Sequence, residues 1–456
     1  MTAVTTRLFR LAERGTNARI EALGGVTTFL TMSYILFVNP AILSAAGLPF
    51  EAVAVATALA AAIATAAMAL ATNLPFALAP GLGINAVVAF DLVLGRGLSW
   101  QVAMAVVVVE GLLAVVLVLV GLREAIMRAI PLSLKLAIGV GIGLFIALVG
   151  LREGGIVVND PATGIALGEM TSGPVLIALA GVAVAIVLTV RRVRGAIVLG
   201  ILASTALGLV FGVLDGPDGI ARWPTSADFS TIGDALALDN LRDALALSLL
   251  PVVFALFMTD FFDTIGTAVA VGRGARLTDE QGQLPNTGRL LLVDSGAAAM
   301  GGAMGCSSVT TYVESGAGVA EGARTGLSTL VTSGLFALAI FFVPLMGLVG
   351  QGVPLNRDVT LHPAVAPALV MVGYLMIRAV AEIDWAAPEA AVPAFLVIAG
   401  VPLTFSIAAG IGFGVLGYVL VMAALGRLRE VHLLMWLVAA LFLLYFTADW
   451  LEVNVF

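Results

Sequence analysis

Two carboxylates stand in the middle of one long apolar stretch. Asp260 and Asp263 lie within residues 246–271, three positions apart, and positions i and i+3 share a face of a helix. An uncompensated charge at the centre of a bilayer costs about 2.5–3.5 kcal/mol, so two acids are hard to keep there without a function. Burial and mutual repulsion favour the protonated form of at least one acid, which suits a proton carrier. A helix end nearer water, or a structural hydrogen bond to a neighbouring segment, is the alternative.

Two other apolar segments are interrupted. Residues 77–91 are broken by Pro80, Gly81 and Gly83, and residues 307–321 are short, polar and rich in glycine. The two segments occupy corresponding places in the two halves of the chain, and such pairs mark the midplane binding sites of transporters. Irregular backbone at that depth survives only where it is buried or lines a cavity, and free amides there can bind polar ligand atoms. The alternative is that the glycines only permit close helix packing.

Polar side chains in the interrupted segments could recognise a flat heterocycle. Glu314 can accept two parallel N–H donors, such as N1–H and the 2-amino group of guanine or N1–H of hypoxanthine. A salt bridge with Arg324 is the alternative for Glu314. Asn85 can donate and accept at the opposite ring edge, or it can cap a half-helix.

Aromatic side chains near these segments could stack on such a ring. The candidates are Tyr312, Phe76, Phe90, Phe261 and Phe262. Packing in the protein core or against lipid is the competing and commoner role for each of them.

Patterns typical of enzymes do not occur. The sequence contains no nucleophile–base set, phosphate loop or zinc spacing, and the single cysteine, Cys306, excludes an internal disulfide and a multi-cysteine metal site. We therefore predict no catalytic residue, no metal and no cofactor apart from a coupling proton. Three other acids flank expected loops and are predicted to be solvated: Asp279, Glu280 and Asp294.

The composition requires a lipid environment. Of 456 residues, 61% are hydrophobic and 11% are charged, whereas soluble domains carry roughly 25% charged residues. The apolar runs are long and continuous, so the fold class is an all-α polytopic membrane protein with about fourteen spans, and not a β-barrel. The basic residues are scattered and the net charge is −7, which excludes a nucleic-acid-binding face.

The apolar segments divide the chain into five parts. Residues 1–20 form a cytoplasmic tail, 21–214 a first set of seven spans, 215–245 an external loop, 246–425 a second set of seven, and 426–456 a C-terminal segment. The last apolar run, 431–449, is either an extra span or a helix at the membrane interface. The predicted spans are 22–43, 52–72, 77–91, 101–121, 130–150, 173–190, 195–214, 246–271, 287–305, 307–321, 326–350, 362–381, 389–404 and 406–425.

Basic residues predict the orientation. With the arginine-bearing N-terminus in the cytoplasm, alternation places Lys135 and most arginines on the same side, as the positive-inside rule requires. Seven spans before the loop give the second half the opposite orientation, which is the topology of an inverted repeat. The tripeptide at 97–99 recurs 229 positions later at 326–328, and the same offset places Asn85 on Glu314. The outer-side exceptions are Arg96, Arg152, Arg222, Arg242 and Arg357.

At these motifs the sequence resembles the AzgA-like guanine–hypoxanthine permeases of the nucleobase–cation symporter (xanthine/uracil permease) family. The resemblance covers nearly the whole chain, and its strongest pieces are residues 31–40, 79–86, 259–267 and 307–315. Uracil and xanthine relatives carry asparagine after the acid of the last motif, where this chain has Ser315, which favours the purine branch.

The resemblance implies proton-coupled uptake of purine bases through an inner-membrane protein with a core domain and a gate domain. It implies fourteen spans in two inverted sevens, with short strands from the third and tenth spans crossing near the substrate. The family's binding positions fall on Asn85, Asp260 and Glu314, with Asp263 as a partner in proton coupling. A homodimer through the exposed gate domain is one arrangement that the resemblance allows.

Other functions remain open at this point. A uracil or xanthine symporter of the same family would share the motifs. An anion transporter of related fold would need net positive charge at the site, against which the three acids argue. A channel or receptor would not accumulate its ligand.

Overall fold

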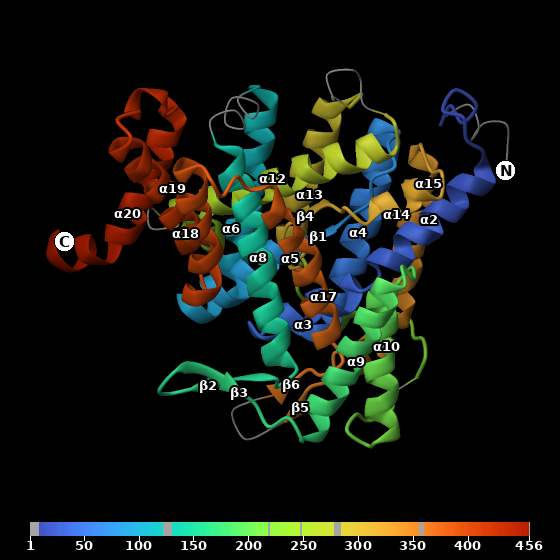
Figure 1. Ribbon diagram of the computed structural model, residues 1–456. Helices are drawn as coiled ribbons and strands as arrows, with labels where there is room; N and C mark the ends of the chain where they lie inside the picture. The colour runs from blue at the N-terminus through green and yellow to red at the C-terminus, as the bar shows by residue number, and fades with distance from the viewer. Residues whose placement is uncertain are drawn as a thin grey trace.

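The architecture is known from a computed structural model that describes residues 9–121, 130–217, 219–246, 249–277, 284–354 and 360–455. Figure 1 shows a mostly helical molecule whose helices run in several directions around a short pair of strands. The helices of the first half are α2 (Ala18–Met32), α3 (Ile35–Ser44), α4 (Phe50–Thr72), α5 (Leu82–Ala86), the π-helical η1 (Val87–Gly95), α6 (Trp100–Leu119), α8 (Leu132–Glu153), α9 (Gly173–Val190) and α10 (Ala196–Val210).

The second half follows a similar sequence of elements. Its helices are α11 (Leu238–Ala244), α12 (Leu250–Gly274), α13 (Thr287–Ala303), α14 (Ser315–Ala320), α15 (Gly326–Ala339), α16 (Val343–Val349), α17 (Ala366–Ile377), α18 (Pro388–Thr404), α19 (Ile407–Ala424) and α20 (Leu433–Val455). The strands of the whole chain are β1 (Leu78–Pro80), β2 (Val157–Asp160), β3 (Gly164–Leu167), β4 (Val309–Thr311), β5 (Val353–Pro354) and β6 (Thr360–Leu361).

The predicted segments coincide with these elements. Each contains a helix, two consecutive helices or, at the two interrupted segments, a strand followed by a short helix. Among the described residues, eight helices are long and apolar enough to cross a membrane by length and composition, and four shorter helices are apolar. The chain is therefore a multi-pass membrane protein, and the number of fourteen spans stays a prediction. The fold is mostly helical, and the described residues also form three two-stranded sheets. The pair β1–β4 matches the short strands that the resemblance implies, whereas the other two sheets were not expected.

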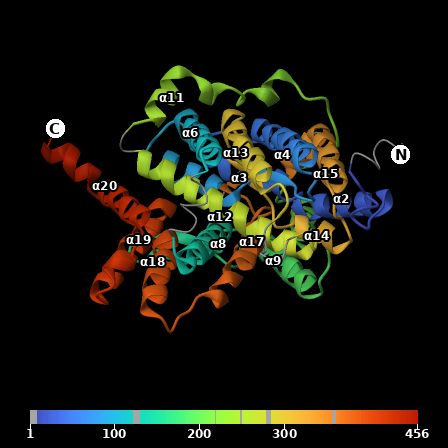
Figure 2. The ribbon, with the colours of Figure 1, turned by 90° about the horizontal axis from the view of Figure 1, so that it is seen from above.

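The helices form two groups, which Figure 2 shows side by side from above. The core group contains α2 to α6 and α12 to α15, and the gate group contains α8 to α10 and α17 to α19. In the core group α4 packs on α15 and α6 packs on α13, while in the gate group α8 packs on both α17 and α18. We name the two groups after the predicted core and gate domains. They meet where α8 of the gate group contacts α5 and α12 of the core group.

One buried acid ties the start of the chain to the core group. Glu21 on α2 has no exposed surface and accepts hydrogen bonds from the backbone N–H groups of Arg324, Thr325 and Ser328 at 2.8, 3.3 and 3.2 Å. A carboxylate at this position satisfies donors at the N-terminus of α15 that have no partner within the helix. These hydrogen bonds hold α2 against the N-terminus of α15, in the second half of the chain.

The predicted external loop is strapped to the core group. The carboxylate of Asp228 accepts hydrogen bonds from both terminal nitrogens of Arg222 at 2.6 and 2.7 Å. Arg222 also donates a hydrogen bond to Glu51, at the start of α4, at 2.8 Å. The hydrogen bonds from Arg222 lower the pKa of Asp228 to about 2. The carboxylate therefore stays charged at neutral pH and holds the loop to α4.

The C-terminal helix packs on the gate group at one end only. Along α20, Phe446 stacks on Phe413 of α19 with ring centroids 5.0 Å apart, and Phe442 is almost fully buried. Toward its C-terminus the helix projects away from the body of the molecule (Figures 1 and 2).

Candidate functional site

The two interrupted segments meet as a pair of crossing strands. Strands β1 and β4 are antiparallel, with Ala79 opposite Thr310 at the centre. Pro80 cannot donate to a ladder, and the chain continues through Gly81, whose N–H donates to the carbonyl of Ser308 at 2.8 Å. At the other end, the N–H of Tyr312 donates to the carbonyl of Ala77 at 3.0 Å. The irregular backbone is thus paired and buried, as the predicted depth in the membrane requires.

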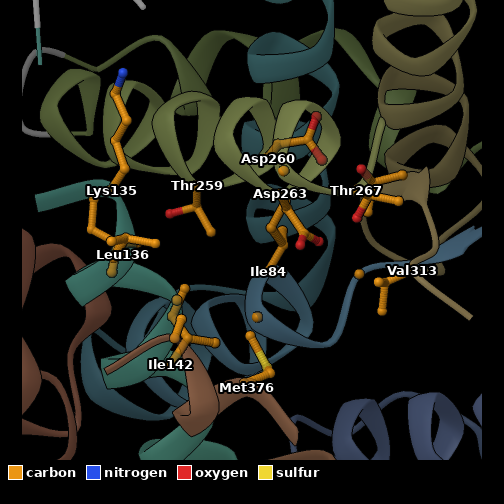
Figure 3. A pocket seen from close by; sticks show the side chains of 17 residues that line it. Ile84, Lys135, Leu136, Ile142, Thr259, Asp260, Asp263, Thr267, Val313 and Met376 are labelled. Carbon is orange, nitrogen blue, oxygen red and sulfur yellow. The ribbon is translucent and has the colours of Figure 1, made fainter. Parts of the chain in front are cut away.

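A cavity of about 280 Å³ lies between these strands, α8 and α12. Figure 3 shows its lining, which runs along α8 from Lys135 to Ile142 and includes Asp260 and Asp263 from α12. Met376 from α17 contributes to the wall on the gate side. A smaller cavity of about 90 Å³ adjoins it, because both are lined by Gly81, Gly83, Asp263, Thr267, Val313 and Met376. The two cavities form one candidate site at the boundary of the core and gate groups.

The two acids of α12 have different surroundings. Asp260 is 2% exposed and accepts a hydrogen bond from Oγ of Ser308 at 3.2 Å, so it contacts the residue before β4. Asp263 is exposed and lines both cavities. In Figure 3 the two carboxylates point in different directions from the helix. The structural hydrogen bond weighed from the sequence is therefore present at Asp260, which lines only the larger cavity, whereas Asp263 lines both.

Glu314 lies at the smaller cavity, beside Asp263. Its Oε1 accepts a hydrogen bond from the hydroxyl of Tyr34 at 2.5 Å. The guanidinium of Arg324 donates instead to the carbonyls of Val319 and Ala323, at 2.7 and 2.6 Å. The alternative role for Glu314, an ion pair with Arg324, is therefore not observed.

Tyr312 also lines the smaller cavity, but its hydroxyl is already used. It donates to the carbonyl of Pro80, which ties the end of β4 to the end of β1. The ring remains available for contact with a ligand, so the predicted role of Tyr312 is confined to its apolar face.

Asn85 does not reach either cavity. It lies on α5 with no exposed surface, and neither Nδ2 nor Oδ1 of its side chain has a hydrogen-bond partner among the described residues. It does not cap α5, whose N-cap position is Gly81. Contact with a substrate would require α5 to move, so the binding role of Asn85 stays a prediction.

Asp294 is a buried acid that the sequence analysis misplaced. It was expected to be solvated, but it has no exposed surface and accepts from Oγ1 of Thr264 at 2.6 Å and from the N–H of Thr311 at 3.0 Å. Thr310 donates to the same carboxylate at 3.4 Å. The available signal was its place between apolar residues inside the predicted span 287–305. Asp279 and Glu280 lie outside the described residues.

Most aromatic candidates pack in the protein interior. Phe76 is fully buried, and Phe261 stacks on Phe257 with centroids 5.8 Å apart, which confirms core packing for both. The ring of Phe90 packs edge to face on Phe145 of α8, with ring centroids 6.0 Å apart. The side chain of Phe262 lies outside the described residues.

Glycines at the site have two roles. A Cβ at Gly318 would lie 2.3 Å from Oγ1 of Thr28, so the close-packing interpretation is confirmed there. A Cβ at Gly83 would lie 3.0 Å from Cγ2 of Ile142, at the meeting of the two groups. By contrast, a Cβ at Gly266 would meet nothing within 4 Å. Gly266 therefore borders open space in the cavity.

A group of aromatic rings lies along α8 beyond Ile142. Phe145 is 1% exposed and contacts Phe90 of the core group and Phe405 between α18 and α19, with centroids 6.0 and 5.3 Å apart. The guanidinium of Arg152 lies 4.8 Å from the Phe405 ring centroid. This edge-to-face stack joins the two helix groups.

Next to the stack, a polar cluster that we call the clasp joins three parts of the chain. Asp91 of η1 accepts from Nε of Arg96 at 2.9 Å and from Oγ of Ser406 at 2.5 Å, and Arg96 donates to the hydroxyl of Tyr445 on α20 at 2.5 Å. All four side chains line a separate cavity of about 1010 Å³. The clasp connects the core group, the gate group and the C-terminal helix.

Comparison with known proteins finds permeases at both the family and the individual level. A family model described as a permease family (Xan_ur_permease) matches residues 19–413. The chain is 43% identical to the guanine/hypoxanthine permease PbuG of Bacillus subtilis, with 96% of this chain and 98% of that protein covered. It is 39% identical to the adenine permease AdeP of Escherichia coli, with 96% and 95% covered.

Solved structures show a similar fold. The transmembrane domain of the cyanobacterial bicarbonate transporter BicA superposes with a TM-score of 0.61 at 18% identity, covering 86% of this chain and 97% of that chain. Murine Slc26a9, an anion transporter in its inward-facing state, gives a TM-score of 0.60 at 11% identity, covering 89% and 68%. At these identities the likeness concerns the fold alone.

Proposed function

The chain belongs to the permease family, among relatives named as guanine/hypoxanthine and adenine permeases, and from this premise we propose that it is a proton-coupled transporter of purine bases. The observation that carries the proposal is the pair of acids, Asp263 and Glu314, at one cavity beside the crossing strands. Transport needs no covalent chemistry, and the relatives are named as permeases. The inner membrane and a cytoplasmic N-terminus remain predictions.

The substrate would bind between β1, β4 and α12. Glu314 would accept ring N–H groups, because a carboxylate forms short, charge-assisted hydrogen bonds with such donors. Asp263 would carry the proton, since it lines both cavities and lies beside Glu314, whereas Asp260 lines only the larger cavity and is bonded to Ser308. The ring of Tyr312 would contact the face of the base. Neutralising one acid while the other holds the base would permit the loaded site to move.

Packing of the helices supports an inverted repeat. The contact of α4 with α15 has a counterpart in the contact of α13 with α6, as expected if a two-fold operation exchanges the halves. The pair α9 and α10 likewise matches the pair α18 and α19. The strand pair β1–β4 would lie at the centre of this operation. Alternating access would then be a movement of the core group against the gate group around the cavity.

The function is tested by uptake of labelled hypoxanthine into cells that express the chain, with guanine, adenine, uracil and sulfate as competitors. Competition by purines alone, with accumulation abolished by a protonophore, is the expected result. Competition by sulfate would favour the second candidate, an anion transporter of related fold. Competition by uracil would place the chain with the uracil and xanthine symporters.

A bulky residue at position 266 is expected to block the site without unfolding the protein. In Gly266→Phe the ring would enter open space in the cavity, because nothing lies within 4 Å of a Cβ there. Removing a helical glycine also favours the helix by up to about 1 kcal/mol. Hypoxanthine uptake should fall at least about 100-fold, equivalent to roughly 2.7 kcal/mol of lost binding. The control is Gly334→Phe on α15, which also has open space around its Cβ and does not line the cavity. Equal uptake by both variants would contradict the assigned site.

Loosening the clasp is expected to let the core and gate groups separate at the cavity that the clasp lines. In Tyr445→Phe, Arg96 loses the hydroxyl that accepts its hydrogen bond, a contact worth about 1.5–3 kcal/mol when one partner is charged. Ala409 lines the same cavity as the clasp. A cysteine at this position should therefore react about 10-fold faster with an impermeant maleimide in a Cys306→Ser background. Tyr418→Phe on α19 is the control. An unchanged rate in Tyr445→Phe would show that the clasp does not restrain the two groups.

A further inference from the structure

Tyr34 occupies the break between α2 and α3. Helix α2 ends at Met32 and α3 begins at Ile35, and Tyr34 lies in the turn between them with a φ of −57° and a ψ of −26°. Its side chain is 1% exposed and lines the smaller cavity together with Glu314 and Asp263. No local pattern in the sequence relates Tyr34 to Glu314, because the two residues lie 280 positions apart.

The hydroxyl of Tyr34 fixes the carboxylate of Glu314. It donates to Oε1 at 2.5 Å, which is the short distance expected when a hydroxyl meets a carboxylate. The main chain of Glu314 is held from the same side, since Oγ1 of Thr31 lies 3.5 Å from its carbonyl oxygen. The last torsion of a glutamate side chain is broad and has no strong intrinsic preference. The hydrogen bond from Tyr34 therefore decides how the carboxylate plane is turned.

We propose that Tyr34 is a positioning residue that turns Oε2 of Glu314 toward the purine and so sets the preference among purine bases. This inference rests on the proposed function. A carboxylate has about four lone-pair sites, and Tyr34 occupies one of them on Oε1. The orientation leaves Oε2, and the remaining site on Oε1, for donors that lie side by side on the ligand.

The preference follows from the donors that each base presents. Guanine presents N1–H beside its 2-amino group and hypoxanthine presents N1–H, whereas N1 of adenine is an acceptor. A fixed carboxylate favours the first two bases, since an acceptor facing an acceptor leaves both without a partner. A carboxylate that can rotate would lose part of this advantage and would bind the three bases more equally.

The test is direct binding of hypoxanthine, guanine and adenine to the purified full-length chain in lipid nanodiscs. Tyr34→Phe keeps the buried ring and removes only the hydroxyl. The dissociation constants for hypoxanthine and guanine should rise about 10-fold, while that for adenine changes less, so the guanine-to-adenine ratio shrinks. The control is Tyr374→Phe, which alters an exposed side chain on α17.

A double variant separates positioning from a structural role. If Tyr34 acts through Glu314, Tyr34→Phe should cause no further loss beyond that of Glu314→Gln, and a partial recovery would agree with the same role because the freed amide can turn its oxygen toward the base. Additive losses, equal weakening of all three bases, or unchanged affinities would overturn the proposal, and the melting temperature without ligand would show any loss of fold. If the unaltered chain binds guanine and hypoxanthine but transports neither, the positioning role survives and the proposed function fails. Binding of none of the three bases by the unaltered chain would overturn both.

Discussion

Glu314→Gln is expected to weaken purine binding about 100-fold while the protein keeps its fold. Glutamine matches the shape of glutamate, and the hydroxyl of Tyr34 can still donate to its Oε1. That contact would hold the amide with its NH₂ group directed at the base, so that a donor faces the ring N–H. The loss of a charge-assisted hydrogen bond and the buried donor left without a partner together cost about 3 kcal/mol.

Binding of hypoxanthine to the purified variant measures this effect. The matched control is Glu321→Gln, at the C-terminal end of α14, because Glu321 forms an ion pair with Arg194 and does not line either cavity. The control should bind within about 3-fold of the unaltered chain. If Glu314→Gln also stays within that range, Glu314 does not contact the substrate.

Asp263→Asn is expected to separate binding from coupling. The side chain of Asp263 lines both cavities, and an asparagine there cannot gain or lose a proton. Accumulation of hypoxanthine driven by a pH gradient should fall at least about 100-fold, which corresponds to roughly 2.7 kcal/mol of lost driving force. Exchange of hypoxanthine across the membrane without a gradient should persist, because the loaded site no longer needs a proton to become neutral.

Asp260→Asn provides the comparison. An asparagine can still accept the hydrogen bond from Ser308, so a smaller effect on accumulation is expected at this position. Both variants are measured in the same preparation, with melting temperatures to exclude unfolding. Loss of coupling in Asp260→Asn with full coupling in Asp263→Asn would assign the proton to Asp260 and contradict our assignment.

Local signals allowed part of the site to be predicted from the sequence. A proline followed directly by a glycine disfavours a continuous helix in an apolar run, and the position of β1 and its short helix follows from Pro80 and Gly81. A carboxylate inside an apolar run is costly in any fold, so Asp260, Asp263 and Glu314 could be selected without a structure. The matching of the two broken segments required only their order along the chain.

Other features depend on contacts between distant segments. Asp260 and Asp263 share a helix face but point about 60° apart, given roughly 100° per residue. Only the packing of the strands shows that Asp263 lines both cavities and that Asp260 is bonded to Ser308. Asn85 is a polar side chain in an interrupted apolar segment, which made it a candidate, yet it is buried on α5 and does not line the cavity. The bond between Tyr34 and Glu314 and the burial of Asp294 involve partners that no local pattern relates.

The most direct test of the account is proton movement caused by a purine. The purified chain is placed in liposomes that contain a pH-sensitive dye, and hypoxanthine is added outside in the absence of any other gradient. The account predicts acidification of the lumen that requires hypoxanthine, is absent with uracil or sulfate, and disappears in Glu314→Gln and Asp263→Asn. Uptake of hypoxanthine with no change of internal pH would contradict proton coupling and the role given to the two acids.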